Sequence, residues 1–474
     1  MSTLRKPTLW MLLIAAVLMA GCKKENNSST SGNSNPNPAQ DTPLSENMFA
    51  EFQSVYQLYP NHDGSFYALA GGDYTDYLLK LDNNGYVQQR VELGFRSRRC
   101  ITKSDDNIVL VGNLGSVSTP YNMYEQGYIA VFDNNMQLVT TVSLTEPSYK
   151  IELYTVKQDL QNPTLFYAGG MAIDGKFVQY PYICTLRFSE GVMTKESSRI
   201  FSDYAQYRIV GMVEIQSAGQ SDLILETIHY DNIDDPYNAD SDAAAHIVKL
   251  NYFGETTGWG HDTWDVAITG PRGNSYTGNN SMDSDENNVY FFGFCNDDKT
   301  PTPASDGYWD SGCVAAVNWH QGQMAWSKVI PFSKKDDRFV EGWISNGCLY
   351  ACGCHSGLLF TNSKEVFSNG LVAKLSLSGE LISYKTFGDP KRRSWLFSMV
   401  NDSQGNMACA GHSDENLGSG KTKWSGWFLK TDMSSSSSKA ILETKQEVED
   451  ETLIDMEAGM ATAPMCDEAG VSGM

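Results

Sequence analysis

Short apolar runs with alternating polar positions, separated by Gly, Asn and Asp turns, recur along the whole chain. The clearest unit is Asn346–Gly388, where a strand ending at Gly353 precedes a loop, and a second strand, Leu371–Leu377, turns into a third. Arg338–Ile344, just ahead of this unit, supplies a fourth strand. A small sheet of four short strands cannot bury both of its faces alone, so it must pack against something similar.

Seven segments share this pattern. The strand that ends in glycine recurs at Phe66–Gly71, Ile108–Gly112, Leu165–Gly169, Val289–Gly293, Leu349–Gly353 and Met407–Gly411, with a copy lacking glycine at Leu223–Thr227. Its partner strand recurs at Tyr77–Asp82, Tyr128–Asp133, Tyr182–Phe188, His246–Asn251, Cys313–Asn318, Leu371–Leu377 and Trp427–Asp432. Four-strand units at a period of roughly 41 to 66 residues are typical of a β-propeller, with one repeat for each blade.

The sequence therefore predicts an all-β fold: a seven-bladed β-propeller with four antiparallel strands per blade, over residues 48–445. The copies resemble degenerate bacterial propeller repeats, and this resemblance implies a fold but no function. Two stacked β-sandwiches are the structural alternative, and the regular copies argue against them. Ala440–Glu443 is predicted as the outer strand of blade seven, and the acidic residues 446–474 as a disordered tail.

The first residues have the features of an export signal. Arg5 and Lys6 precede the apolar stretch Leu9–Met19, which is too short to span a membrane comfortably. The run Leu18-Met19-Ala20-Gly21 before Cys22 resembles the lipobox of bacterial lipoproteins, although Met is less usual than Leu at its position. The resemblance implies a signal peptide over 1–21 and lipidation of Cys22. An ordinary secretory signal with an incidental cysteine is the alternative.

Residues 22–47 form a polar stretch rich in Asn, Ser and Pro, which predicts a flexible tether. The start of this stretch resembles surface lipoproteins of gut-type Gram-negative anaerobes, and no Asp follows Cys22. Both features favour a lipid anchor in the outer membrane and exposure at the cell surface. The formal net charge of −22 argues against a nucleic-acid partner, because phosphate binding needs a basic surface.

Unequal loop lengths predict which face of the propeller carries function. With strands ordered from the ring centre outward, the loops between second and third strands share one face with the crossings between blades. This face carries all the long loops, which contain Tyr308, Trp309 and Trp424 among other aromatics. Aromatic planes beside Asn and Asp suit sugar rings. The alternative is that these long loops pack on their own aromatic side chains.

Basic residues recur on the crossings at a similar offset before the glycine-ended strands. They are Lys150, Arg208, Lys334 and Arg392, joined by Arg272 in blade five and Arg96 in blade two. Because the innermost strands line the ring centre, this pattern predicts a funnel for an anionic group such as a uronate, sialate, sulfate or carboxylate. The alternative is that they are ordinary loop side chains, some paired with neighbouring carboxylates.

The cysteines and acidic loops predict little chemistry. Cys295 and Cys313 lie at the base of one loop, where both a disulfide and two separate thiols are compatible with the spacing. Cys348, Cys352 and Cys354 share strand parity and are interpreted as buried thiols rather than metal ligands. The loop His229–Asp242 is rich in carboxylates that could hold Ca²⁺, but it lacks the EF-hand order. A solvated loop is favoured, and no metal or cofactor is predicted.

No nucleophile elbow, P-loop or HExxH signature occurs, so an enzymatic function such as a glycan lyase or hydrolase has no support in the sequence. The sequence favours a lipid-anchored β-propeller of the cell envelope that acts as a ligand-binding module, for an acidic glycan or another anion. A protein-interaction scaffold in an outer-membrane complex is the alternative, since long loops serve both functions.

Overall fold

The computed structural model describes residues 41–72, 75–104, 107–115, 126–217, 220–229, 244–252, 259–268, 275–296, 310–330, 332, 336–357, 368–389, 392–416 and 422–433. Its contacts divide the chain into two units, 1–39 and 40–474, and the fold below is that of the second unit. Cys22, the predicted signal, nearly all of the tether, and the tail lie outside the described residues. Within the described residues, no helix has the length and apolarity needed to cross a membrane.

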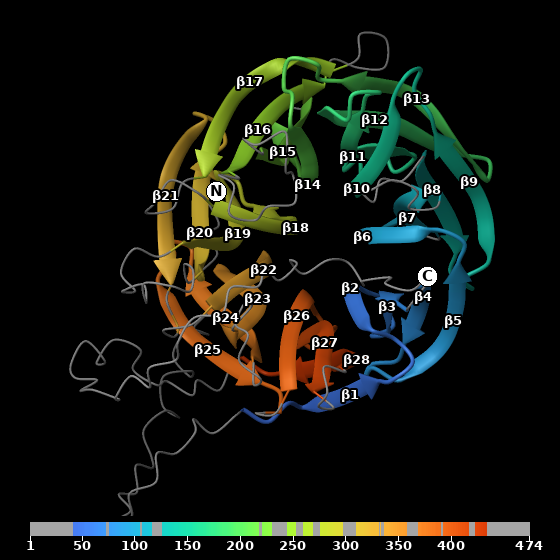
Figure 1. Cartoon of the computed structure of the whole chain (residues 1–474). Helices are drawn as coiled ribbons and strands as arrows, with labels where there is room; N and C mark the ends of the chain where they lie inside the picture. The colour runs from blue at the N-terminus through green and yellow to red at the C-terminus, as the bar shows by residue number, and fades with distance from the viewer. Residues whose placement is uncertain are drawn as a thin grey trace, which may run out of the picture. The chain divides into compact units, whose positions relative to one another are not determined.

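The described chain folds into seven antiparallel sheets of four strands arranged in a ring (Figure 1). Blades one and two are β2 (Ser54–Pro60), β3 (Phe66–Gly71), β4 (Asp76–Leu81), β5 (Val87–Leu93), and β6 (Arg96–Ser104), β7 (Asn107–Leu114), β8 (Gln126–Asp133), β9 (Leu138–Leu144). Blades three and four are β10 (Lys150–Gln158), β11 (Leu165–Ile173), β12 (Gln179–Ser189), β13 (Val192–Ile200), and β14 (Tyr207–Ser217), β15 (Gln220–His229), β16 (Ala244–Tyr252), β17 (Trp259–Ile268).

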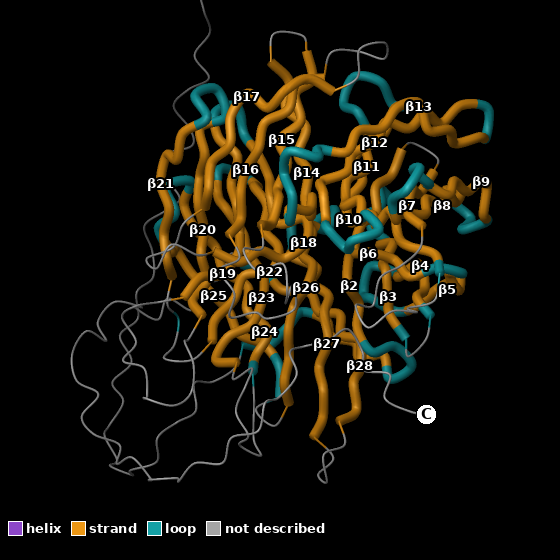
Figure 2. Tube along the Cα trace, turned by 45° about the horizontal axis from the view of Figure 1, so that its top comes forward, coloured by secondary structure: helices purple, strands orange, loops and turns teal. Residues whose placement is uncertain are grey.

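Blades five and six are β18 (Ser275–Ser284), β19 (Asn288–Asn296), β20 (Asp310–Asn318), β21 (Gln323–Ile330), and β22 (Asp336–Ser345), β23 (Cys348–Gly357), β24 (Asn369–Ser376), β25 (Leu381–Phe387). Blade seven contains β26 (Arg392–Asn401), β27 (Met407–Asn416), β28 (Thr422–Thr431) and β1 (Ser45–Phe49). Figure 2 shows only strands and loops in the described residues. The predicted seven-bladed, all-β propeller is therefore confirmed.

The ring closes with a strand from the beginning of the chain. β1 pairs with β28 from Ser45 opposite Lys430 to Phe49 opposite Gly426, and Figure 1 shows the two strands side by side. The prediction of Ala440–Glu443 as the outer strand was wrong, because β1 occupies that place. Phe49 and Phe52 anchor the closing segment in the apolar cluster between blades seven and one.

The core consists of buried clusters that lie between neighbouring blades, one for each of the seven pairs. Between blades six and seven, for example, Cys352 and Val372 pack against Cys409, Trp427 and Leu429. Each sheet therefore has both faces covered by its neighbours. Since apolar burial is the main favourable term in folding, no blade can be stable without the blades beside it.

The glycine within the second strand of blades six and seven is explained by a bulge in the innermost strand. The register slips by one residue in β22 and in β26, which brings a backbone carbonyl oxygen over the neighbouring strand. A Cβ atom on Gly353 would lie 1.8 Å from the Arg338 oxygen, and one on Gly411 would lie 1.7 Å from the Trp395 oxygen. Only glycine fits such an approach.

Polar side chains of one blade accept hydrogen bonds from innermost-strand amides of the next. The amide of Met399 donates to Glu341 at 2.8 Å, and that of Ile344 donates to Asp283 at 2.7 Å. In the same way, the backbone amides of Leu58, Leu153 and Ser281 donate to the side-chain oxygens of Ser398, Asn113 and Glu226, respectively. These bonds matter because an innermost strand has a neighbour on one side only.

The face opposite the long loops is built from tight turns capped by aspartate. In blade seven, one oxygen of Asp402 accepts the amides of Gln404 and Asn406, both at 2.8 Å. Its other oxygen lies 2.6 Å from the Nζ of Lys430, and both side chains are buried. Asp402 thus joins the β26–β27 turn to β28, the strand that carries the closing partner.

We predict that Gly411→Ala lowers the free energy of unfolding by at least about 2 kcal/mol, because its Cβ would overlap the Trp395 carbonyl. Gly175→Ala is the matched control, since no atom lies within 4 Å of the Cβ position there. Urea unfolding of both variants measures the difference. Equal stability of the two would contradict the bulge explanation.

A second prediction concerns how the stability that Asp402 contributes depends on pH. Burial alone would raise the pKa of Asp402, but hydrogen bonds from Lys430 and Asn406 outweigh it and hold the pKa below 3.8. The ionised carboxylate therefore contributes its full stability above the unfolded pKa, and this stability is lost as pH falls through the lower folded pKa. Asp402→Asn should cost about 3 kcal/mol at pH 7, because Lys430 stays buried without its partner.

The difference between Asp402→Asn and the unmodified protein should shrink in urea unfolding as the pH falls below 3.8. Asp63→Asn serves as control, because Asp63 caps the equivalent turn of blade one but lies 3.9 Å from Lys80 and is 62% exposed. That substitution should cost less than about 1 kcal/mol. Equal losses from both substitutions would disprove the role assigned to the buried pair.

Candidate functional site

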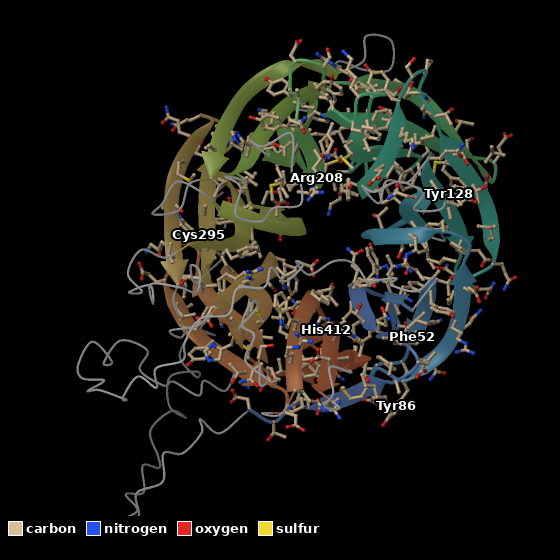
Figure 3. All side chains as sticks on the ribbon, viewed as in Figure 1. Phe52, Tyr86, Tyr128, Arg208, Cys295 and His412 are labelled. Carbon is tan, nitrogen blue, oxygen red and sulfur yellow. The ribbon has the colours of Figure 1, made fainter. Side chains whose placement is uncertain are left out.

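Four of the predicted basic residues lie where the innermost strands begin. Arg96, Lys150 and Arg392 are the first residues of β6, β10 and β26, and Arg208 is the second of β14. Because every blade repeats the same strand order, these starts share one face of the ring, here called the loop face. Figure 3 shows Arg208 near the ring centre. Arg272 and Lys334 lie outside the described residues.

These four side chains do not form a uniform cationic ring. Arg96 lies 3.2 Å from the buried carboxylate of Asp76, so its charge is largely compensated. Arg392 is 3.9 Å from Asp389, and the Arg208 guanidinium lies 5.5 Å from the ring centroid of Tyr154. Lys150 makes no ion pair with any described residue. The predicted pairing of loop cations with carboxylates thus holds for Arg96 and, more loosely, for Arg392.

The structure adds an arginine that the sequence pattern missed. The guanidinium of Arg338, on β22, lies 4.2 Å from the ring centroid of Phe294 and 5.9 Å from that of Trp395. Phe294 belongs to blade five and Trp395 to blade seven. Arg338 therefore stands between aromatic rings from both neighbouring blades, and all three side chains are partly exposed. A guanidinium between such rings is stabilised by their π-electrons and stays oriented.

The aromatic surface continues across blade seven. Trp395 and His412 are direct cross-strand partners with ring centroids 6.3 Å apart, and His412 meets Trp424 edge-on at 4.8 Å. Arg393 lies over Trp424 at 5.4 Å. Figure 3 shows His412 on the inner part of this blade. We call Phe294, Arg338, Arg393, Trp395, His412 and Trp424 together the rim patch.

The buried carboxylate of Asp414 holds Arg393 in place, and the buried carboxylate of Asp337 fixes the chain next to Arg338. Asp414, across the sheet from Arg393, accepts its amide at 3.0 Å and its Nε at 2.7 Å, and also bonds its terminal nitrogen. Asp337 precedes Arg338 and is fully buried. It accepts the Phe332 amide at 3.0 Å and lies 2.9 Å from the Nδ1 of His355. The starts of β22 and β26 are therefore fixed, which preorganises the patch.

The rim patch offers both stacking surfaces and charged donors to a ligand. Trp424 is 38% exposed and the Arg393 side chain 36%. Flat aromatic faces stack on the apolar faces of sugar rings, and guanidinium groups bind carboxylate or sulfate oxygens in pairs. The patch thus has the chemistry that an acidic sugar requires.

The sequence prediction for the site was partly right. Trp424 belongs to the rim patch, although it lies on β28 and not in a loop, because β27 and β28 extend further than expected. Tyr308 and Trp309 lie outside the described residues. Arg338, Arg393 and Trp395 were not predicted, because the fixed offset before the glycine-ended strands marks positions on the crossings. Alternation along the strand Arg392–Asn401, with Arg393 and Trp395 on one face, was the available signal.

The cysteines named in the described part of the chain are free thiols, which favours separate thiols over a disulfide for Cys295 and Cys313. Cys295 and Cys313 are not joined to each other. Cys295 lies opposite Ser311, while Cys313 lies opposite Gly293, so the two are diagonal and not direct neighbours. Diagonal positions are about 7–8 Å apart, beyond the reach of a disulfide. Cys352 and Cys354 are buried as predicted, whereas Cys348 is only partly buried.

Burial raises the pKa of the Cys352 and Cys409 thiols well above their ordinary value, so neither is an ionised nucleophile near neutral pH. No group of three or more His, Cys, Asp or Glu side chains that could hold a metal ion occurs in the described part of the chain. The predicted acidic loop His229–Asp242 lies almost entirely outside that part.

No family model matches the chain, and no curated protein matches it. Among solved structures, Sqt1 of Saccharomyces cerevisiae superimposes with a TM-score of 0.45 and 10% identity, over 83% of this chain and 100% of that one. The BP39L lectin of Burkholderia pseudomallei superimposes with a TM-score of 0.44 and 10% identity, over 78% of this chain and 98% of the lectin. The α-L-arabinofuranosidase Arb93A of Fusarium graminearum superimposes with a TM-score of 0.40 and 11% identity, over 70% of this chain and 92% of that enzyme. Such scores carry no argument about function.

Proposed function

We propose that this protein is a ligand-binding module of the cell envelope that holds an acidic glycan, or another anion-bearing ligand, at the rim patch. The observation that carries this proposal is Arg338, placed between Phe294 and Trp395 from the two blades beside its own. A side chain needed only for solubility has no reason to be held between two partly exposed rings.

The electrostatics of the whole chain support an anionic ligand at a local site. A net charge of −22 repels anions in general, and Asp414 compensates the charge of Arg393, so it is Arg338 that supplies positive charge for an anion at this rim. Binding there is selective, because an anion that misses the patch meets an acidic surface. The aromatic rings add contacts that do not depend on salt, whereas the charged contacts weaken as salt rises.

The N-terminal sequence features support the outer membrane as the place where this binding module acts. A signal peptide over 1–21 and a lipobox ending at Cys22 would leave the protein anchored in the outer membrane by lipid, at the end of a polar tether. A propeller held in this way at the cell surface would meet glycans before they enter the cell. Mass spectrometry of the membrane-bound protein would test lipidation of Cys22.

A protein-interaction scaffold is the second candidate, and one observation favours it. Leu138 and Val139 on β9 are 57% and 41% exposed, and Val192 on the adjacent β13 is 53% exposed. Exposed apolar side chains on neighbouring outer strands are typical of a contact surface. This surface lies on the outer edge of blades two and three, away from the rim patch, so the two functions are compatible.

We predict that Arg338→Glu lowers affinity for a polyuronate by at least about tenfold, because a charge-assisted hydrogen bond contributes about 1.5–3 kcal/mol. Trp424→Ala should weaken binding without changing its salt dependence, since that ring supplies stacking only. Binding of the purified protein to immobilised polygalacturonate at several salt concentrations measures both effects.

Arg90→Glu is the control, because it makes the same change of charge at an exposed position on β5, the outer strand of blade one. Its retention should match that of the unmodified protein. Equal loss of retention in Arg338→Glu and Arg90→Glu would show that net charge, and not the rim patch, governs binding. No retention of any acidic polymer by the unmodified protein would rule out the proposed function.

A further inference from the structure

The crossing from blade three to blade four forms an arch beside a small cavity on the loop face. Residues 201–206 make this arch, and two backbone hydrogen bonds tie it to β12. The Phe201 amide donates to the Pro181 carbonyl oxygen at 3.0 Å, and the Gln206 amide donates to the Gln179 carbonyl oxygen at 2.7 Å. The arch is therefore fixed at both of its ends against the start of one strand.

The cavity beside the arch is apolar and has a volume of about 20 Å³. Aromatic rings of the arch and of β14 line it, together with side chains of blade four such as Leu225 and Val248. Tyr204 and Tyr207 are partly exposed, whereas the other lining residues are buried, so the mouth lies beside these two rings. A volume of this size holds one water-sized group, and apolar walls favour a methyl group over water.

Two buried side-chain amides near the cavity have atoms without hydrogen-bond partners. The Oε1 of Gln179 and the Nε2 of Gln206 are buried, and neither meets a partner among the described residues. Both residues are only 6% exposed. Burying such an atom without a hydrogen bond is destabilising, so its presence needs a reason. One of the two atoms is an acceptor and the other is a donor.

Strand geometry places both amides beside the cavity. Residues two apart on a strand share a face and lie about 6–7 Å apart, so Gln179 lies next to Pro181. Ile183, two residues further on the same face, packs in the cluster between blades three and four, so this face of β12 turns toward blade four. Gln206 directly precedes Tyr207, and its φ of +70° is kept by a residue other than glycine only where the surroundings fix it.

An acetamido group has the chemistry that this arrangement requires. Its N–H can donate to Gln179, its carbonyl oxygen can accept from Gln206, and its methyl group can fill the apolar cavity. A hydroxyl group can bridge the two amides, but it leaves the cavity without an apolar occupant. A carboxylate has no hydrogen to donate to Gln179, and it would lose its hydration beside apolar walls.

We infer that the arch and the cavity form a binding site for N-acetylated sugars, here called the acetamido site. The rings of Tyr204 and Tyr207 at its mouth offer apolar surface to the sugar ring. The acetamido site belongs to blades three and four, whereas the rim patch belongs to blades five, six and seven. The two sites are separate, and an uncharged sugar can bind here without the anion binding proposed above.

The test is a ligand-observed NMR titration of the purified full-length protein with N-acetylglucosamine, N-propanoylglucosamine and glucose. N-acetylglucosamine should bind at least about tenfold more tightly than glucose, because it adds two hydrogen bonds and one buried methyl group. N-propanoylglucosamine should bind more weakly than N-acetylglucosamine, since its extra carbon overfills the cavity. Saturation transfer from the protein should be strongest at the acetyl methyl group.

Two variants separate binding from folding. Gln179→Met and Gln206→Met keep the approximate shape of each side chain and remove its amide. Each should lower the affinity for N-acetylglucosamine at least about threefold. Each should also leave the free protein as stable as before, or more stable, in urea unfolding, because a buried polar atom without a partner is removed. Gln321→Met, at an exposed position on the β20–β21 turn, is the control and should change neither quantity.

Three results would overturn the acetamido site and leave the proposed function standing. The first is equal affinity for N-acetylglucosamine and glucose. The second is lower stability of both methionine variants with unchanged binding, which would mean that a bridging water joins the two amides and that they serve the fold alone. The third is binding of N-propanoylglucosamine as tight as that of N-acetylglucosamine, which would contradict the fit of one methyl group to the cavity.

Discussion

The whole ring depends on how its innermost strands satisfy their backbone amides. Each such strand has a hydrogen-bonded neighbour on one side only, so every second amide points away from its sheet. An unpaired buried amide is destabilising. Side chains from the preceding blade, such as Glu341 toward Met399, accept several of these amides. The blades are thus joined by directional bonds as well as by apolar packing.

This constraint also explains where a site can form. The bulge that brings the Arg338 carbonyl over Gly353 turns the start of the strand, and the side chain then lies between two other blades. The resulting site belongs to the ring and not to any single blade, since Phe294, Arg338 and Trp395 come from three of them. Loops can vary around such a site while the aromatic and basic side chains remain on rigid strands.

The fold was predictable because its strongest requirements are local. Gly411 must be glycine for steric reasons, and Asp402 caps its own turn, so both kinds of residue recur in most of the repeats. The closing strand was not predictable, because Ser45–Phe49 is short, half polar, and pairs with residues far along the chain. The rim patch was only partly predictable for the same reason: Trp424 stood out locally, but the contact of Arg338 with Trp395 spans two blades.

The closing strand has a mechanical consequence. Residues 41–44 of the predicted tether lead directly into β1, which takes in the last three tether residues and runs antiparallel to β28 over five paired positions. If the tether is held by lipid, a pull on the protein acts along the axis of β1. Its hydrogen bonds to β28 are then loaded together in shear and do not open one after another. Under the proposed lipid anchoring, the strand nearest the point of attachment would thus also be the strand that closes the ring.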